Sequence, residues 1–267
     1  MKPSRLAILG LGVLLVLVAL LYLWPAKSPE PPIVMEPDEP VSAPETTELA
    51  IRHPLPEPPT PQPGEKEEPA PPLPDLAESD PYVKDLLSRL YEDPSLRQLL
   101  VPQHFVRRMV LIIDALPKRN VPMQHLPLRK PSGQFQTEGE EDAKVIGTGN
   151  AARYTPYVRL AEAVPVQQLA ATYLRIYPIT EQAYRELGHP QGYFHDRMIA
   201  VLDLLLATPE VDEPIPLVGH VKVYRFADPE LEALSSGQKV LLRMGGENAR
   251  RVKAVLQKLR DQLVTKN

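Results

Sequence analysis

Apolar residues recur at helical spacing in three stretches of the chain after residue 100. The first, residues 103–116, has a stripe made by Phe105, Met109, Ile112, Ile113 and Leu116. Residues 193–207 and residues 247–263 repeat this spacing. Positions three and four apart lie on one face of an α-helix, and an apolar face of this kind is normally buried. We therefore predict three amphipathic helices that contribute to a core.

Shorter signals predict the rest of this domain. Aspartate followed by proline, a typical helix start, occurs at positions 80–81, 93–94 and 228–229. Other helices are expected at residues 82–91, 157–163, 165–177, 179–187 and 229–234, with a hairpin within residues 134–146 and a strand at residues 218–226. Residues 147–152 match a relaxed dinucleotide-binding pattern but lack the buried strand that should precede it, so we interpret them as a turn. The pattern predicts a mainly α, compact domain with a few short β-strands over residues 75–267.

The most apolar part of the chain is its beginning. No charged residue occurs in a run that starts at Leu6 and ends at Trp24, and Lys2 and Arg5 precede it. A helix of about 20 apolar residues crosses the ~30 Å hydrocarbon core of a bilayer. The small residues at positions 26 and 28 form the best cleavage motif, but Pro29 follows directly and suits cleavage poorly. We predict an uncleaved transmembrane helix at residues 6–24, with residues 1–5 cytoplasmic because positive charge stays inside.

Proline and acidic residues dominate residues 25–74. This stretch holds 17 prolines and ten acidic residues against three basic ones. Proline is excluded from helix interiors and central strands, and like charges repel, so a packed core is not expected. We predict a disordered proline-rich linker that reaches at most roughly 150 Å at ~3.1 Å per residue. The linker is interpreted as a spacer within the cell envelope.

Charge and cysteine content limit the classes of partner and the cell compartment that we expect. Residues 75–267 hold 25 basic and 24 acidic residues, so the domain is nearly neutral and has no field that would favour nucleic acid. The chain has no cysteine, which agrees with export and excludes a thiol nucleophile. Together with the apolar run, this predicts a single-pass inner-membrane protein with a periplasmic C-terminal domain.

Several stretches resemble a known family. They read NAARYTPYV at residues 150–158, YPITEQAYRELG at 177–188, GYFHDR at 192–197, LLLATP at 204–209, YRFADPELE at 224–232 and QKVLLRMG at 238–245. In combination they resemble the proteobacterial domain-of-unknown-function family 3014, over roughly residues 75 to 265. The resemblance implies an anchored envelope protein of a Gram-negative bacterium. It implies no activity, cofactor or catalytic residue.

One segment between two predicted helices concentrates unusual chemistry. We expect a recognition surface made by His189, Gly192, Tyr193, His195, Asp196 and Arg197. Tyr193 would offer a stacking ring, and the charged and imidazole side chains would offer hydrogen bonds. The alternative is a simple turn, with Asp196 placed at the positive end of the next helix. No histidine spacing fits a metal site, and no nucleophile motif occurs, so no catalytic, cofactor or metal residue is assigned.

Three functions remain open from the sequence. We favour a non-catalytic adapter or scaffold for other envelope proteins. The second is a module that binds peptidoglycan, another glycan or lipid through the basic side of residues 247–263. The third is a hydrolase with an unrecognised site, for which Glu181, His195 and Asp196 are the candidate residues.

Overall fold

The computed structural model describes residues 51–56, 72–220 and 223–264. The predicted transmembrane helix at residues 6–24 and most of the predicted linker lie outside this part of the chain. Within the part described, no helix is both long and apolar enough to cross a membrane.

The domain is built mainly from α-helices. In chain order they are α2 (Ser79–Leu90), α3 (Pro94–Arg97), α4 (Phe105–Ala115), α5 (Asn150–Glu162), α6 (Val166–Glu186), α7 (Phe194–Leu206), α8 (Pro229–Ala233), α9 (Ser236–Arg243) and α10 (Gly246–Leu263). Short 3-10 turns occur at η2 (Leu76–Glu78) and η3 (Met123–His125). The strands pair as two antiparallel hairpins, β1 (Thr137–Glu138) with β2 (Val145–Ile146) and β3 (Leu217–His220) with β4 (Val223–Phe226). A mainly α domain with a few short strands is confirmed.

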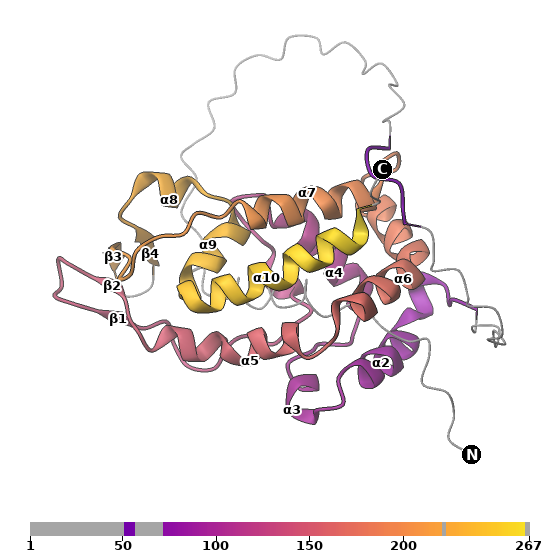
Figure 1. Ribbon diagram of the computed structural model, residues 1–267, viewed down its shortest axis with the longest axis horizontal. Helices are drawn as coiled ribbons and strands as arrows, with labels where there is room; N and C mark the ends of the chain where they lie inside the picture. The colour runs from indigo at the N-terminus through magenta and orange to yellow at the C-terminus, as the bar shows by residue number, and fades with distance from the viewer. Residues whose placement is uncertain (1–50, 57–71, 221–222, 265–267) are drawn as a thin grey trace, which may run out of the picture.

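The three predicted amphipathic helices form the centre of the domain. Figure 1 shows α10 running between α7 and α5, and α10 also packs against α6 and α9. Helix α4 packs against α2, α6 and α7, and eight of its 11 residues are buried. The predicted stripe residues Phe105, Met109 and Ile113 are all fully buried. Local periodicity therefore identified the helices that share the main core.

Side-chain caps start three of the shorter helices. Asp93 accepts a hydrogen bond from Ser95 N at the start of α3, and Asp228 accepts one from Glu230 N at the start of α8. Ser235 and Gln238 form a reciprocal capping box at the start of α9. Helix α9 was not predicted, although the serine and the glutamine three residues later are a sequence signal for it.

The predicted helix boundaries were wrong at two interior prolines. Residues 165–177 and 179–187 were expected to be two helices, but α6 continues through Pro178. Helix α5 begins at Asn150, not at Tyr157, and includes Pro156. An interior proline removes one backbone hydrogen bond and disfavours a helix. In α6 the buried residues on both sides of Pro178 compensate, because one continuous helix keeps them all in the core.

The single strand expected at residues 218–226 is a hairpin. Leu217 pairs with Phe226, and Gly219, at a φ of 112°, pairs with Tyr224. A positive φ is accessible to glycine without steric cost, so β3 accommodates this conformation within the paired strand. Leu217 and Phe226 belong to a second, smaller apolar cluster with α8. The hairpins and α8 lie at one end of the molecule, beside α9 (Figure 1).

The buried face of α7 gives a stability prediction. Leu202 is fully buried, whereas Leu206 on the same helix is only partly buried. Leu202→Ala should lower the free energy of unfolding by about 2–5 kcal/mol, since it leaves a cavity in the core. Leu206→Ala, the matched control, should cost clearly less. Urea denaturation of the two variants measures both values, and equal losses would contradict this assignment of the core face.

Candidate functional site

The six residues of the predicted recognition surface lie at the junction of α6 and α7. Gly188, at a φ of 112°, ends α6, and Gly192 lies directly against the Tyr184 ring and against the Cβ and backbone of His189. A Cβ atom at Gly192 would lie 2.7 Å from the Tyr184 ring and 2.9 Å from the His189 Cβ. The His189 ring stacks on Tyr184 with ring centres 4.3 Å apart. The loop is therefore tightly packed and brings Tyr193 to the start of α7.

A buried carboxylate holds the first turn of α7. Glu181 accepts hydrogen bonds from Phe194 N at 2.9 Å and from the Tyr177 hydroxyl at 2.6 Å. Arg185 lies 3.2 Å from the same carboxylate as an ion pair. Glu181 thus satisfies a backbone N–H that has no partner within the helix, and it complements the positive end of the helix. Burial of the Tyr177 hydroxyl, together with its hydrogen bond to Glu181, raises the pKa of Tyr177 well above its usual value.

His195 is fully buried and joins three helices. Its Nε2 lies 3.1 Å from the Leu263 carbonyl oxygen, which can only accept, so Nε2 carries the proton. Its Nδ1 then accepts from the Tyr173 hydroxyl at 3.0 Å. Burial lowers the pKa of His195 because it disfavours the charged imidazolium. The imidazole is therefore a neutral link between α6, α7 and the end of α10.

Arg197 and His189 both approach Asp114, a buried residue of α4. Arg197 Nε lies 3.0 Å from an Asp114 carboxylate oxygen, and Arg197 Nη2 donates to the Asp114 carbonyl at 2.6 Å. His189 Nε2 lies 3.7 Å from the carboxylate, and Lys118 donates to it at 2.7 Å. Burial opposes the charged form of Asp114, but the bond from Lys118 and the charge of Arg197 outweigh it and lower the pKa. Asp114 therefore fixes both the loop and α7.

Tyr193 and Asp196 face a different partner, a short segment from the predicted linker. The backbone N–H groups of Arg52 and His53 donate to the two carboxylate oxygens of Asp196, at 3.0 and 2.7 Å. Burial raises the pKa of the Tyr193 hydroxyl, and the nearby backbone of Leu55 opposes this rise. The Leu55 side chain is partly buried against the main core. Figure 1 shows this indigo segment beside the start of α7.

We call this segment, residues 51–56, the docked segment, and Tyr193 with Asp196 the α7 site. The docked segment has no helix or strand, yet Arg52, His53 and Leu55 contact the folded domain where a disordered linker was expected. The physical reason is that Leu55 is partly buried against a core supplied by the folded domain. The Tyr193 ring also meets the rings of Tyr177 and His195, with centres 5.9 and 6.1 Å apart. The α7 site is therefore an aromatic surface with one carboxylate at its edge.

The candidate residues of the hydrolase alternative do not form a catalytic group. Glu181 binds Tyr177 and Phe194, His195 binds Tyr173 and Leu263, and Asp196 binds the docked segment. No hydrogen bond joins any two of the three within residues 51–56, 72–220 and 223–264. In the same described ranges, no cluster of three or more histidine or acidic residues could hold a metal ion.

Two parts of this site were not found from the sequence. Asp114 lies off the apolar stripe of α4, and its burial depends on partners that come from α7 and the preceding loop. The docked segment was hidden by the composition of the whole linker. A local signal exists, because residues 49–56 contain no acidic residue and include Leu49, Ile51 and Leu55.

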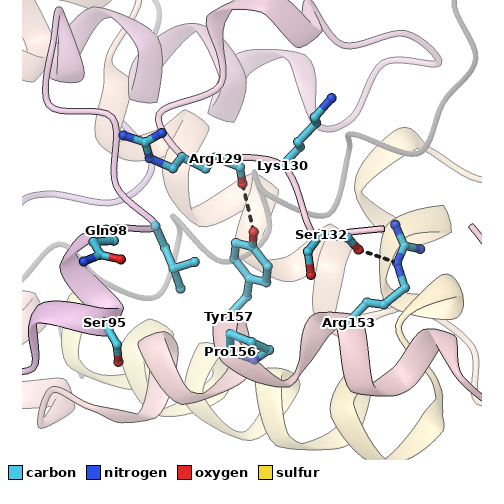
Figure 2. A pocket seen from close by; sticks show the side chains of 9 residues that line it. Ser95, Gln98, Arg129, Lys130, Ser132, Arg153, Pro156 and Tyr157 are labelled. Carbon is cyan, nitrogen blue, oxygen red and sulfur yellow. Dashed lines mark hydrogen bonds between the residues drawn. The ribbon is translucent and has the colours of Figure 1, made fainter. Parts of the chain in front are cut away.

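A shallow hollow lies elsewhere, between α3, α5 and the chain at residues 129–132. Its volume is about 460 Å³, and it is lined by Ser95, Gln98, Leu99, Arg129, Lys130, Ser132, Arg153, Pro156 and Tyr157. The Tyr157 hydroxyl donates to the Arg129 carbonyl at 3.0 Å, and Arg153 Nε donates to the Ser132 carbonyl at 3.0 Å (Figure 2). Figure 2 also shows the Lys130 amine directed away from Tyr157. These polar groups fix the loop that forms the wall.

The basic side of α10, proposed from the sequence as a glycan or lipid surface, is largely paired. Arg251 and Arg260 form ion pairs with Glu162 and Asp203. Arg250 lies 4.0 Å from Glu210, and Lys253 donates to the Thr208 carbonyl at 2.9 Å. Paired cations offer less charge to an anionic ligand than the sequence suggested.

The buried imidazole gives a pH prediction. Because folding lowers the pKa of His195 from 6.5, the unfolded chain takes up a proton below about pH 6.5 that the folded chain does not. The free energy of unfolding should therefore fall as the pH drops from 7.5 to 5.5, by at most ~1.4 kcal/mol per pH unit from this group. His195→Gln removes the titrating group and should flatten the dependence. His125→Gln, the control at an exposed histidine, should leave the pH dependence of the free energy of unfolding unchanged. Urea denaturation of each variant at pH 7.5 and pH 5.5 measures this dependence.

Comparisons with known proteins place the chain in a family. Neither the curated proteins nor the solved structures contain a significant match. The family model described as "Protein of unknown function (DUF3014)" matches residues 105–260, which is more than half of the chain and covers α4 to most of α10. The match includes the α7 site and excludes the docked segment. The chain belongs to the DUF3014 family.

Proposed function

We propose that this chain is a single-pass inner-membrane protein whose periplasmic domain is a non-catalytic adapter for other envelope proteins. The apolar run from Leu6 to Trp24, with Lys2 and Arg5 before it, supports the anchor and its orientation. The proline-rich stretch that follows supports a spacer between the membrane and the domain. The α7 site is the surface through which the adapter binds its partner.

One observation carries the adapter proposal. The α7 site holds residues 51–56 through backbone N–H groups and one aliphatic side chain. Hydrogen bonds from backbone N–H groups to a carboxylate, together with an apolar anchor, are contacts that can hold a peptide on a protein surface. The remaining polar groups of the junction, on Glu181, His195 and Arg197, are engaged inside the domain. This arrangement supports a site that binds a peptide.

The alternatives have less support. Four of the five basic residues of α10 that motivated glycan or lipid binding have partners on other elements. The three residues of the hydrolase alternative are bonded to separate partners.

The location of the domain can be tested with protease. If residues 75–267 are periplasmic, protease added to spheroplasts should digest the domain, and protease added to intact cells should not. Digestion is followed by immunoblotting against the domain, with a cytoplasmic protein as the control for lysis. Protection of the domain in intact, unlysed spheroplasts would contradict the proposed orientation.

The adapter proposal predicts a protein contact at the α7 site. A photo-reactive amino acid at position 193, introduced in living cells, should give a discrete adduct of higher mass after illumination. The same amino acid at position 251 is the matched control, because Arg251 is paired with Glu162 on another face of the domain. Mass spectrometry of the adduct identifies the partner.

Two results would contradict the adapter proposal. One is the absence of any protein adduct at position 193 in cells that export the folded chain. The other is an identical set of adducts from positions 193 and 251, since this would indicate random collision.

A further inference from the structure

We propose that the α7 site recognises a peptide with the chemistry and the bent backbone of residues 51–56, and that the docked segment is an internal ligand that competes with such a peptide. This inference rests on the proposed function, because it names the partner chemistry of the same site.

The backbone contributes the polar part of the recognition. Two successive N–H groups, of Arg52 and His53, donate to the two oxygens of one carboxylate. Hydrogen bonds to a charged acceptor are stronger than neutral ones. The side chains of Ile51 and Arg52 are exposed, so they do not select the sequence. The site therefore requires two successive residues that are not proline, because proline has no N–H.

The next two residues add selectivity. Pro54 follows His53 directly and fixes the backbone φ at its position at little entropic cost. Leu55 then places its side chain against the main core, and its backbone lies near the Tyr193 hydroxyl. A ligand for this site consequently has two non-proline residues, a proline and an aliphatic residue, in that order.

Covalent attachment gives the docked segment an advantage over any free peptide. Only 15 residues, 57–71, separate it from the next described residue of the same chain. A ligand joined by a short connection competes at an effective concentration on the order of mM. A partner peptide of the same chemistry therefore binds weakly while the docked segment is in place, and it binds well once the segment has left.

Direct binding tests the internal ligand. The probe is a fluorescein-labelled synthetic peptide with the sequence of residues 49–58, added to the full-length chain in detergent and followed by fluorescence anisotropy. Leu55→Asp should release the docked segment and tighten peptide binding at least roughly ten-fold. Ile51→Asp is the matched control, because Ile51 belongs to the same segment but is 58% exposed. It should leave binding as weak as in the unaltered chain.

A second variant tests the carboxylate. In the Leu55→Asp chain, Asp196→Asn should weaken peptide binding roughly ten-fold or more, because an amide cannot accept both N–H groups as a carboxylate does. Asp212→Asn, at an exposed residue after α7, is the control and should have no effect. A probe peptide with proline in place of the histidine lacks one of the two N–H groups and should also bind at least ten-fold less. Circular dichroism verifies that each variant is folded.

Several outcomes would overturn the inference. Equal binding by the Leu55→Asp and Ile51→Asp chains would show that the segment does not block the site. Binding that Asp196→Asn leaves intact would show that the peptide binds elsewhere. A dimer in sedimentation velocity that Leu55→Asp dissociates would make a second copy the holder of the segment. If the peptide results hold but position 193 gives no adduct in cells, the proposed adapter function fails while the ligand chemistry stands.

Discussion

The carboxylate of Asp114 is the constraint on which the interaction surface depends. It is buried at the end of α4, in the middle of the domain, and a buried charge is tolerated only when it is paired. Lys118 comes from the chain just after α4, but Arg197 and His189 must come from α7 and the loop before it. The need to pair one charge on the central helix thus fixes where α7 can begin.

The first turn of α7 shows the result of this constraint. Phe194 lies in the core, His195 bonds to α6 and the end of α10, and Arg197 bonds to α4. Glu181 holds the backbone N–H of Phe194. Phe194, His195 and Arg197 thus all contact the interior of the domain. Asp196 and Tyr193 are the residues of this turn that contact another segment of the chain. A peptide that binds them meets a surface whose geometry is already set, and such preorganisation lowers the entropic cost of association.

Sequence reasoning succeeded where the signal is local. The stripe from Phe105 to Leu116 and the corresponding positions in α7 and α10 predicted buried helix faces, because burial on one side of a helix imposes a period of 3.6 residues. It failed at Pro178, where burial along all of α6 outweighs a local preference. Asp114 was missed because its partners are distant in sequence. The docked segment was missed because its six residues were averaged into a proline-rich linker of 50.

Attachment of residues 51–56 to α7 also has a mechanical consequence. Tension applied to the chain ahead of Ile51 would reach Asp196 and Tyr193 before it reached α2, since the docked segment comes first along the chain. Those few bonds would break under a smaller load than the helical core. Their rupture would lengthen the connection by at most roughly 65 Å, at ~3.1 Å per residue from position 51 to 72. The domain would stay folded while the released chain lengthened. The contacts of residues 51–56 with Asp196 and Tyr193 would form again when the tension is removed.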